Sequence, residues 1–86
     1  MKPDYNLDDR HSKDAEKKEF AKLIGQRLHK IRIERNISQE QLSEKAGYYR
    51  TFIGHIENST RSPSMHTIWR IANALGIKIK DITEDL

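Results

Sequence analysis

The sequence predicts an all-α domain of about five helices, and three observations support this. Apolar side chains recur at intervals of three and four residues over most of the chain, as they do along one face of a helix. Serine, asparagine and glycine stand where such runs would begin and end. The one alternating stretch, IKIKDI at 77–82, has no second strand to pair with. We expect residues 19–86 to form the domain, preceded by a polar segment at 1–18.

The polar segment is expected to be either a loose tail or an extension of the first helix. Ser12 or Asp14 could cap this helix, which should run to about Arg35 and end at Asn36. Its inward stripe would consist of Phe20, Leu23, Ile24, Leu28 and Ile31.

Two short helices are predicted next. Ser38 should cap a helix over 39–46, because its hydroxyl can accept the N–H of Gln41 while the Gln41 side chain returns to the Ser38 backbone. Gly47 would end that helix in the left-handed conformation, and a third helix would cover about 49–57. Two short helices joined by a turn that contains glycine have the layout of a helix-turn-helix.

The remaining chain predicts two more helices. Pro63 and Ser64 introduce the fourth, which should end at Gly76 and point Met65, Ile68, Ile71, Ala72 and Leu75 inward. A last short helix would place Ile79, Ile82 and Leu86 on one side.

Composition excludes several classes of function. The 86 residues include no cysteine, so disulfides, thiolate metal sites and thiol catalysis are excluded. The histidines share no metal-ligand spacing, and no phosphate-binding glycine loop is present, so we expect no metal, no cofactor and no enzymatic activity. No apolar run approaches the roughly 18 residues of a membrane span, and a secretory signal is lacking, so we expect a cytoplasmic protein.

The charge distribution favours a polyanionic partner. The formal net charge is +3, and acidic and basic residues balance in 1–18 and in 64–86. The whole excess therefore lies in 19–63, the part that contains the two short helices.

Several motifs in order carry a resemblance to a known family. SQEQLSEKAG is followed by RTFIGHIEN, by the SP of RSPS and by IANALGI. These motifs resemble the phage-repressor helix-turn-helix family (Cro/C1, XRE-type), and KIRIERNISQEQLSEKAG with RTFIGHIE is most similar to restriction–modification controller proteins. The resemblance covers about residues 20–83. It implies a repressor-like, five-helix DNA-binding domain that regulates transcription, with double-stranded DNA as its partner and no small-molecule effector.

In this resemblance the third helix is the recognition helix, which lies in the major groove. Arg50 would donate two hydrogen bonds to a guanine, Thr51 would contact a base edge or a thymine methyl, and His55 would reach a base or a phosphate. The alternative for each is a solvated helix face. Arg61 lies in the following loop and is expected to contact a base, or else to be a free loop cation. The expected phosphate contacts are Ser38, Gln39, Tyr48, Tyr49 and Ser62.

Two of these phosphate contacts have an alternative, and a third departs from the pattern of the family. Gln39 could instead be a simple first-turn residue. Tyr48 could be half-buried rather than reach a phosphate, and Tyr49 stands where relatives have a small capping hydroxyl. Arg32 and Glu57 are expected to form an ion pair that joins the first helix to the end of the third and does not touch DNA.

One recognition helix reads too few base pairs to select a site, so we expect a homodimer on a pseudo-palindromic operator, with recognition helices about 34 Å apart. The expected interface consists of Trp69, Ile77, Ile79, Ile82 and Leu86, unless Trp69 completes the core. The alternative function is a protein-interaction module such as an antitoxin or co-regulator, which would present an apolar patch rather than exposed Arg50, Thr51, Gln39 and Arg61.

Overall fold

The computed structural model describes the backbone of residues 9–86 and the side chains of residues 13–86. All regular structure within this range is helical, which confirms the predicted all-α fold. The helices are α1 (Asp9–Glu34), α2 (Gln39–Lys45), α3 (Phe52–Glu57), α4 (Met65–Leu75) and α5 (Ile79–Thr83). No helix of this part of the chain combines the length and the apolar character that crossing a bilayer requires.

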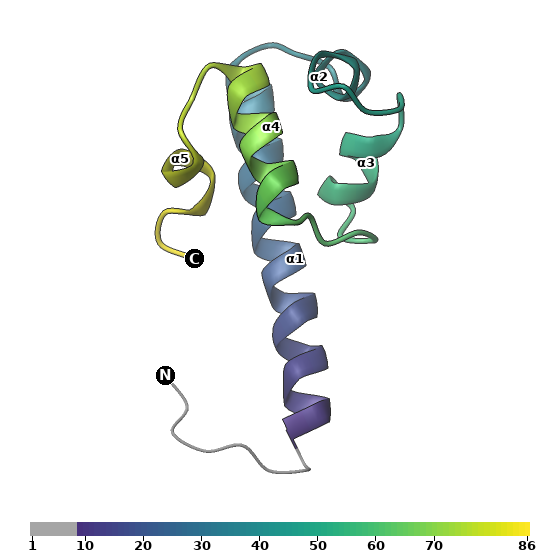
Figure 1. Cartoon of the computed structure of the whole chain (residues 1–86), viewed down its shortest axis with the longest axis vertical. Helices are drawn as coiled ribbons and strands as arrows, with labels where there is room; N and C mark the ends of the chain where they lie inside the picture. Colours follow the sequence, from purple (N-terminus) through teal and green to yellow (C-terminus); the bar gives the residue numbers. More distant parts are fainter. Residues whose placement is uncertain (1–8) are drawn as a thin grey trace.

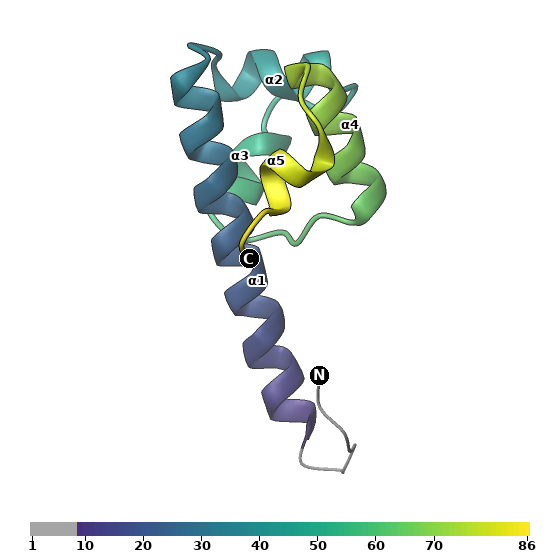
Figure 2. The ribbon, with the colours of Figure 1, turned by 90° about the vertical axis from the view of Figure 1, so that its left-hand side faces the viewer.

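The long helix α1 lies along one side of the domain, and the shorter helices gather beside its C-terminal half (Figures 1 and 2). Its C-terminal half contacts α3 and α5, while α2 packs against α3 and α4, and α4 against α5. Its N-terminal half projects beyond the other helices, as both views show. The side chains that are most fully buried at the centre are Ile24, Leu28, Leu42, Ile53, Ile56, Ile68, Ile71 and Ile82.

The first helix begins earlier than predicted. Because α1 starts at Asp9, Ser12 and Asp14 lie inside the helix and neither caps it. The part of the polar segment that is described therefore extends the helix, and residues 1–8 lie outside the described range. The extension contains good helix formers such as Ala15 and Glu16.

The local signals at helix ends act as predicted. The Ser38 hydroxyl accepts the Gln41 N–H at 3.0 Å, and the Ser38 N–H donates to the Gln41 side chain at 2.9 Å. Ser64 caps α4 through its side chain. Gly47 and Gly76 both adopt the left-handed conformation, with φ of 86° and 69°. These contacts join residues only three or four positions apart, so the local sequence is enough to predict them.

Two residues expected in the core are exposed instead, Phe20 (37 %) and Met65 (60 %). Small residues take the inward positions of α1 near Phe20, because Ala21 and Gly25 are both buried. A Cβ atom on Gly25 would lie 2.6 Å from the carbonyl oxygen of Ile56. The crossing of α1 and α3 is therefore so close that only glycine fits there.

The C-terminal segment also departs from expectation. Leu86 lies beyond α5, after a left-handed Asp85 (φ 62°), and is 43 % exposed. Ile82 is only 2 % exposed within the single chain. It packs in the core of its own molecule, so its expected place in a dimer interface is wrong. After α3, Ser59 adopts the left-handed conformation (φ 63°).

Candidate nucleic-acid interface

A buried serine joins the two helices of the helix-turn-helix. The Ser43 hydroxyl, in α2, donates to the Gln39 carbonyl oxygen at 2.8 Å. Its oxygen accepts the N–H of Ile53, in the first turn of α3, at 3.0 Å. Thr51, the N-cap residue of α3, makes no side-chain hydrogen bond to the helix. Ser43 therefore satisfies an N–H group that a capping side chain would otherwise take, and so fixes α3 against α2. Sequence reasoning missed this residue.

The predicted base-contacting residues of the third helix are all exposed. The helix begins at Phe52 rather than at 49, and the Phe52 N–H closes a turn onto the Tyr49 carbonyl at 3.0 Å. Arg50 and Thr51 therefore lie in the turn before α3, and His55 follows on its outer side. The residues that face the core are Phe52, Ile53 and Ile56.

A shallow hollow of about 250 Å³ brings four side chains together beside α3: Tyr49, His55, Thr60 and Arg61. The Arg61 guanidinium carbon lies 5.3 Å from the centroid of the Phe52 ring, which places this loop cation at the start of α3. The Thr60 hydroxyl donates to the His55 carbonyl at 3.0 Å. Thr60 is not among the site residues predicted from the sequence, and its spacing from His55 does not indicate that the two are in contact. We define the reading surface as Tyr49, Arg50, Thr51, His55, Thr60 and Arg61.

The two adjacent tyrosines have different roles. Tyr49 is 52 % exposed. Tyr48 is half-buried, and its ring stacks on Phe52 with centroids 4.1 Å apart. Its hydroxyl donates to the Thr67 hydroxyl, in α4, at 3.2 Å. Of the two alternatives for Tyr48, the structure has the half-buried one, because its hydroxyl proton is already engaged inside the protein.

The expected ion pair between Arg32 and Glu57 is present and nearly buried. Arg32 Nε donates to Glu57 Oε2 at 2.6 Å, and Arg32 Nη2 donates to Oε1 at 3.0 Å. His29 Nδ1 lies 2.8 Å from Glu57 Oε1, and Gln39 Nε2 donates to the same oxygen at 3.1 Å. The Glu57 side chain is 4 % exposed and that of Arg32 9 %. This cluster connects α1, α2 and α3.

The surroundings of Glu57 keep it ionised. Burial of the carboxylate would by itself raise the pKa of Glu57. The hydrogen bonds from Arg32, His29 and Gln39, together with the charge of Arg32, outweigh burial, so this pKa lies below its usual value. The hydrogen bond to Glu57 in turn raises the pKa of Arg32. Both groups are therefore charged at neutral pH.

Besides the two tyrosines, the predicted phosphate contacts lie at the start of α2 and in the loop after α3. Ser38 and Gln39 are both partly exposed, and Gln39 also contacts α3 through Glu57. A Cβ atom on Gly54 would lie 3.3 Å from Gln39 Oε1, so the glycine leaves room for this amide on the surface of α3. Ser62 is half-buried in the loop.

Some of the basic side chains of residues 19–63 stabilise the fold. Arg27 Nη1 contacts the Ile82 carbonyl at 3.5 Å, and Arg35 Nη1 donates to the Leu75 carbonyl at 2.9 Å. Together with Arg32, these arginines hold α1 to other elements. The two carbonyl acceptors carry no charge, so the net positive charge of residues 19–63 is unchanged, but fewer of its guanidinium groups are free to bond an external partner.

A second exposed region lies on α4, the segment before α5 and the first residue of α5. Trp69 is 51 % exposed, which contradicts the alternative that it completes the core. It shares a hollow of about 410 Å³ with Ala72, Ile77 and Ile79, and the hollow is also lined by Asn73, Lys78 and Lys80. We define the apolar patch as Trp69, Ile77 and Ile79. Among the described residues, no group of three or more His, Asp or Glu side chains is placed to hold a metal ion.

Comparison with known proteins gives consistent matches. A family model described as Helix-turn-helix (HTH_3) matches residues 28–82. The chain is 42 % identical over 59 residues to the immunity repressor protein of Bacillus phage phi105, covering 69 % of this chain and 41 % of that repressor. It therefore spans less than half of that relative. It is 40 % identical over 63 residues to control protein C.BamHI of Bacillus amyloliquefaciens, covering 72 % of this chain and 78 % of that one.

Solved structures give the same result. The restriction-modification controller protein C.AhdI from Aeromonas hydrophila matches with a TM-score of 0.72 and 31 % identity, covering 76 % of this chain and 94 % of that one. An HTH_3 family transcriptional regulator from Vibrio cholerae matches with a TM-score of 0.75 and 26 % identity, covering 80 % and 39 %. These similar proteins are regulators and controller proteins, not enzymes.

Proposed function

Because this chain belongs to the helix-turn-helix family of transcriptional regulators, we propose that it binds one specific duplex DNA site through the reading surface, and that it does so as a twofold homodimer. The observation that carries the proposal is the exposure of the reading surface on a helix pair held rigidly from behind. Ser43 fixes α3 against α2, and the Glu57 cluster fixes both helices to α1. Side chains that read bases need such a fixed support.

Four residues of the reading surface can contact bases. The Arg50 guanidinium can donate two bonds to guanine O6 and N7, which discriminates against other bases by about 1–3 kcal/mol. The Thr51 hydroxyl can bond a base edge, and its methyl group can pack on thymine. His55 and Arg61 border one hollow, so they can reach neighbouring positions of the same groove.

Phosphate contacts would set the register on the duplex. Ser38 and Gln39 at the start of α2, Ser62 in the loop and Tyr49 of the reading surface all have side chains that are at least partly exposed, so they can take this role. Tyr48 is left out of this set, because its hydroxyl donates to Thr67.

The apolar patch supports a homodimer. A half-exposed tryptophan beside two partly buried isoleucines leaves apolar area in contact with water, and a second copy would cover it. Twofold symmetry would place two recognition helices about 34 Å apart, one turn of DNA, and would require a pseudo-palindromic operator. Leu86, exposed at the C-terminus, can join this interface, whereas the buried Ile82 cannot.

Selection of binding sites from random-sequence duplexes, followed by gel-shift titration over a salt series, tests the DNA proposal. We expect one enriched pseudo-palindrome. Arg50→Ala should weaken binding to it by about 1–3 kcal/mol and relax the preference at one base pair in each half-site. Lys30→Ala, on the outer side of α1, is the matched control. Failure to enrich any sequence would refute the proposal and favour a protein-interaction module.

Sedimentation equilibrium without DNA tests the dimer. The wild-type chain should dimerise at micromolar concentration, while Ile79→Asp and Trp69→Ala should shift the equilibrium toward the monomer. A wild-type chain that remains monomeric at high micromolar concentration would contradict the homodimer without affecting the assignment of the reading surface.

A further inference from the structure

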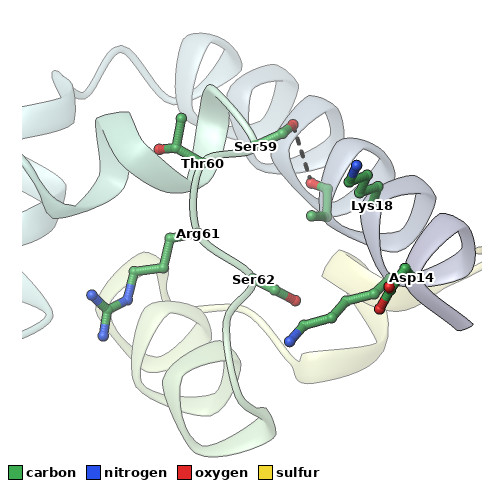
Figure 3. A pocket seen from close by; sticks show the side chains of 8 residues that line it. Asp14, Lys18, Ser59, Thr60, Arg61 and Ser62 are labelled. Atoms are coloured by element: carbon green, nitrogen blue, oxygen red, sulfur yellow. Dashed lines mark hydrogen bonds between the residues drawn. The ribbon is translucent and has the colours of Figure 1, made fainter. Parts of the chain in front are cut away.

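A third hollow, of about 450 Å³, lies between the projecting part of α1 and the loop that follows α3. Figure 3 shows Asp14 and Lys18 on the α1 side and Ser62 facing them from the loop. We define the basic groove by the residues that line this hollow: Asp14, Lys17, Lys18, Ala21, Ser59, Thr60, Arg61 and Ser62.

The α1 wall of the basic groove continues the helix face that is buried farther along. Ala21 marks the edge of the core, and Lys17 and Lys18 take the same face one turn earlier. This face becomes polar and basic where it leaves the core, so it is not built to pack against an apolar surface. Neither Lys17 nor Lys18 has an ion-pair partner within residues 13–86, and both side chains are exposed. Their ammonium groups are available to an external anion.

The basic groove is continuous with the reading surface, because Thr60 and Arg61 border both hollows. The loop contributes hydroxyl groups as well. Ser59 donates to the Ala21 carbonyl at 3.5 Å and so holds the loop against α1, while the Ser62 hydroxyl points toward the groove (Figure 3). A chain of anionic groups that passes the reading surface would thus meet Arg61 and then the two lysines.

Resting on the proposed function, we propose that the basic groove binds phosphates of the DNA backbone adjacent to the bases that the reading surface contacts. Ammonium and hydroxyl groups in an open groove are the donors that a phosphodiester chain requires. The part of α1 before Ala21 begins at Asp9, and twelve helical residues span about 18 Å, close to five base pairs of duplex. The α1 residues of the groove precede the segment matched by the family model, which begins at residue 28. The projecting helix therefore adds sequence-independent contacts to a shared domain.

The basic groove also contains one opposing charge, that of Asp14, and this allows a test by gain of affinity. Asp14→Asn removes a carboxylate that would face the phosphates, so binding should tighten by about two- to fivefold, as expected for an exposed charge. A destabilised variant would not bind more tightly, so this outcome cannot arise from misfolding. Unchanged or weaker binding by Asp14→Asn would contradict the proposal, provided that thermal unfolding shows a folded variant.

The second test measures the salt dependence of binding by the full chain, on the selected operator and on an unrelated duplex of equal length. Each phosphate contact contributes about 0.9 to the slope of log affinity against log salt. In a dimer, Lys17→Gln or Lys18→Gln should therefore lower the slope by about 1.8 on both duplexes. Between about 50 and 200 mM salt the wild type should then lose about tenfold more affinity than the variant.

Lys30→Gln is the matched control, because it makes the same change of charge on the same helix about 120–140° away from Lys18 and Lys17. Slopes for Lys17→Gln and Lys18→Gln that equal the control would overturn the proposal. A loss confined to the operator would also overturn it, since this would indicate base reading. If the wild type does not distinguish the two duplexes, the proposed function fails, while the slopes on either duplex still report on the groove.

Discussion

Replacing Glu57 with glutamine would leave the Arg32 guanidinium buried without a counter-charge. Arg32 is 8 % exposed and the Glu57 side chain 4 %, so little solvent screening reduces the effect. Breaking a buried ion pair from one side costs about 3–5 kcal/mol. Glutamine keeps the shape and one acceptor oxygen, so we expect the lower end of that range, about 3 kcal/mol. For a domain of this size the melting temperature should fall by about 12–24 °C.

The effect should depend on pH in a defined direction. Because the pKa of Glu57 is lowered in the folded state, its contribution to stability is fully present above the unfolded pKa of about 4.3 and is lost as the pH falls through the folded pKa. The difference in free energy of unfolding between the wild type and Glu57→Gln should therefore be greatest at neutral pH. It should shrink as the pH is lowered below about 4.3.

Urea unfolding followed by circular dichroism at pH 7, 5, 4 and 3 measures this difference directly. Other carboxylates titrate equally in both proteins, so the difference isolates Glu57. Glu44→Gln, an exposed glutamate of α2, should stay within about 0.5 kcal/mol of the wild type. A difference below about 1 kcal/mol at pH 7, or one that does not decrease toward pH 3, would refute the role of the buried pair.

Three further substitutions test how the helices are held together. Ser43→Ala leaves the Ile53 N–H buried without its acceptor and should cost about 1–3 kcal/mol in urea unfolding, whereas Ser62→Ala should change little. Gly25→Ala places a Cβ against the Ile56 carbonyl, so it should lower the free energy of unfolding by about 1–3 kcal/mol although alanine has the better helix propensity. It should also weaken operator binding. A stabilised variant would show that the crossing of α1 and α3 is looser than described. Ile82→Ala should cost about 2–5 kcal/mol in the monomer while Leu86→Ala stays near neutral, and equal effects would contradict the distinction drawn between them.

The sequence by itself determined the features that depend on neighbours a few residues apart. The capping box at Ser38, the turns at Gly47 and Gly76 and the cap at Ser64 involve local hydrogen bonds, so their residue types and spacing predict them. The same periodicity divided α3 into a buried side and an exposed side that carries His55. The motif resemblance supplied the pairing of Arg32 with Glu57, which no local pattern contains.

Only the tertiary structure decided which of several chemically similar residues meets which partner. Tyr48 and Tyr49 are adjacent, yet one stacks on Phe52 and bonds Thr67 while the other stays exposed. In the sequence Ser43 is an ordinary serine within a helix, and only the packing of α3 against α2 brings the Ile53 N–H within hydrogen-bond distance of its hydroxyl. Thr60 of the reading surface and Lys17 of α1 lie near each other because the loop after α3 crosses α1. These contacts join residues far apart in the sequence, and periodicity records only which side of a helix is apolar, not what packs against it.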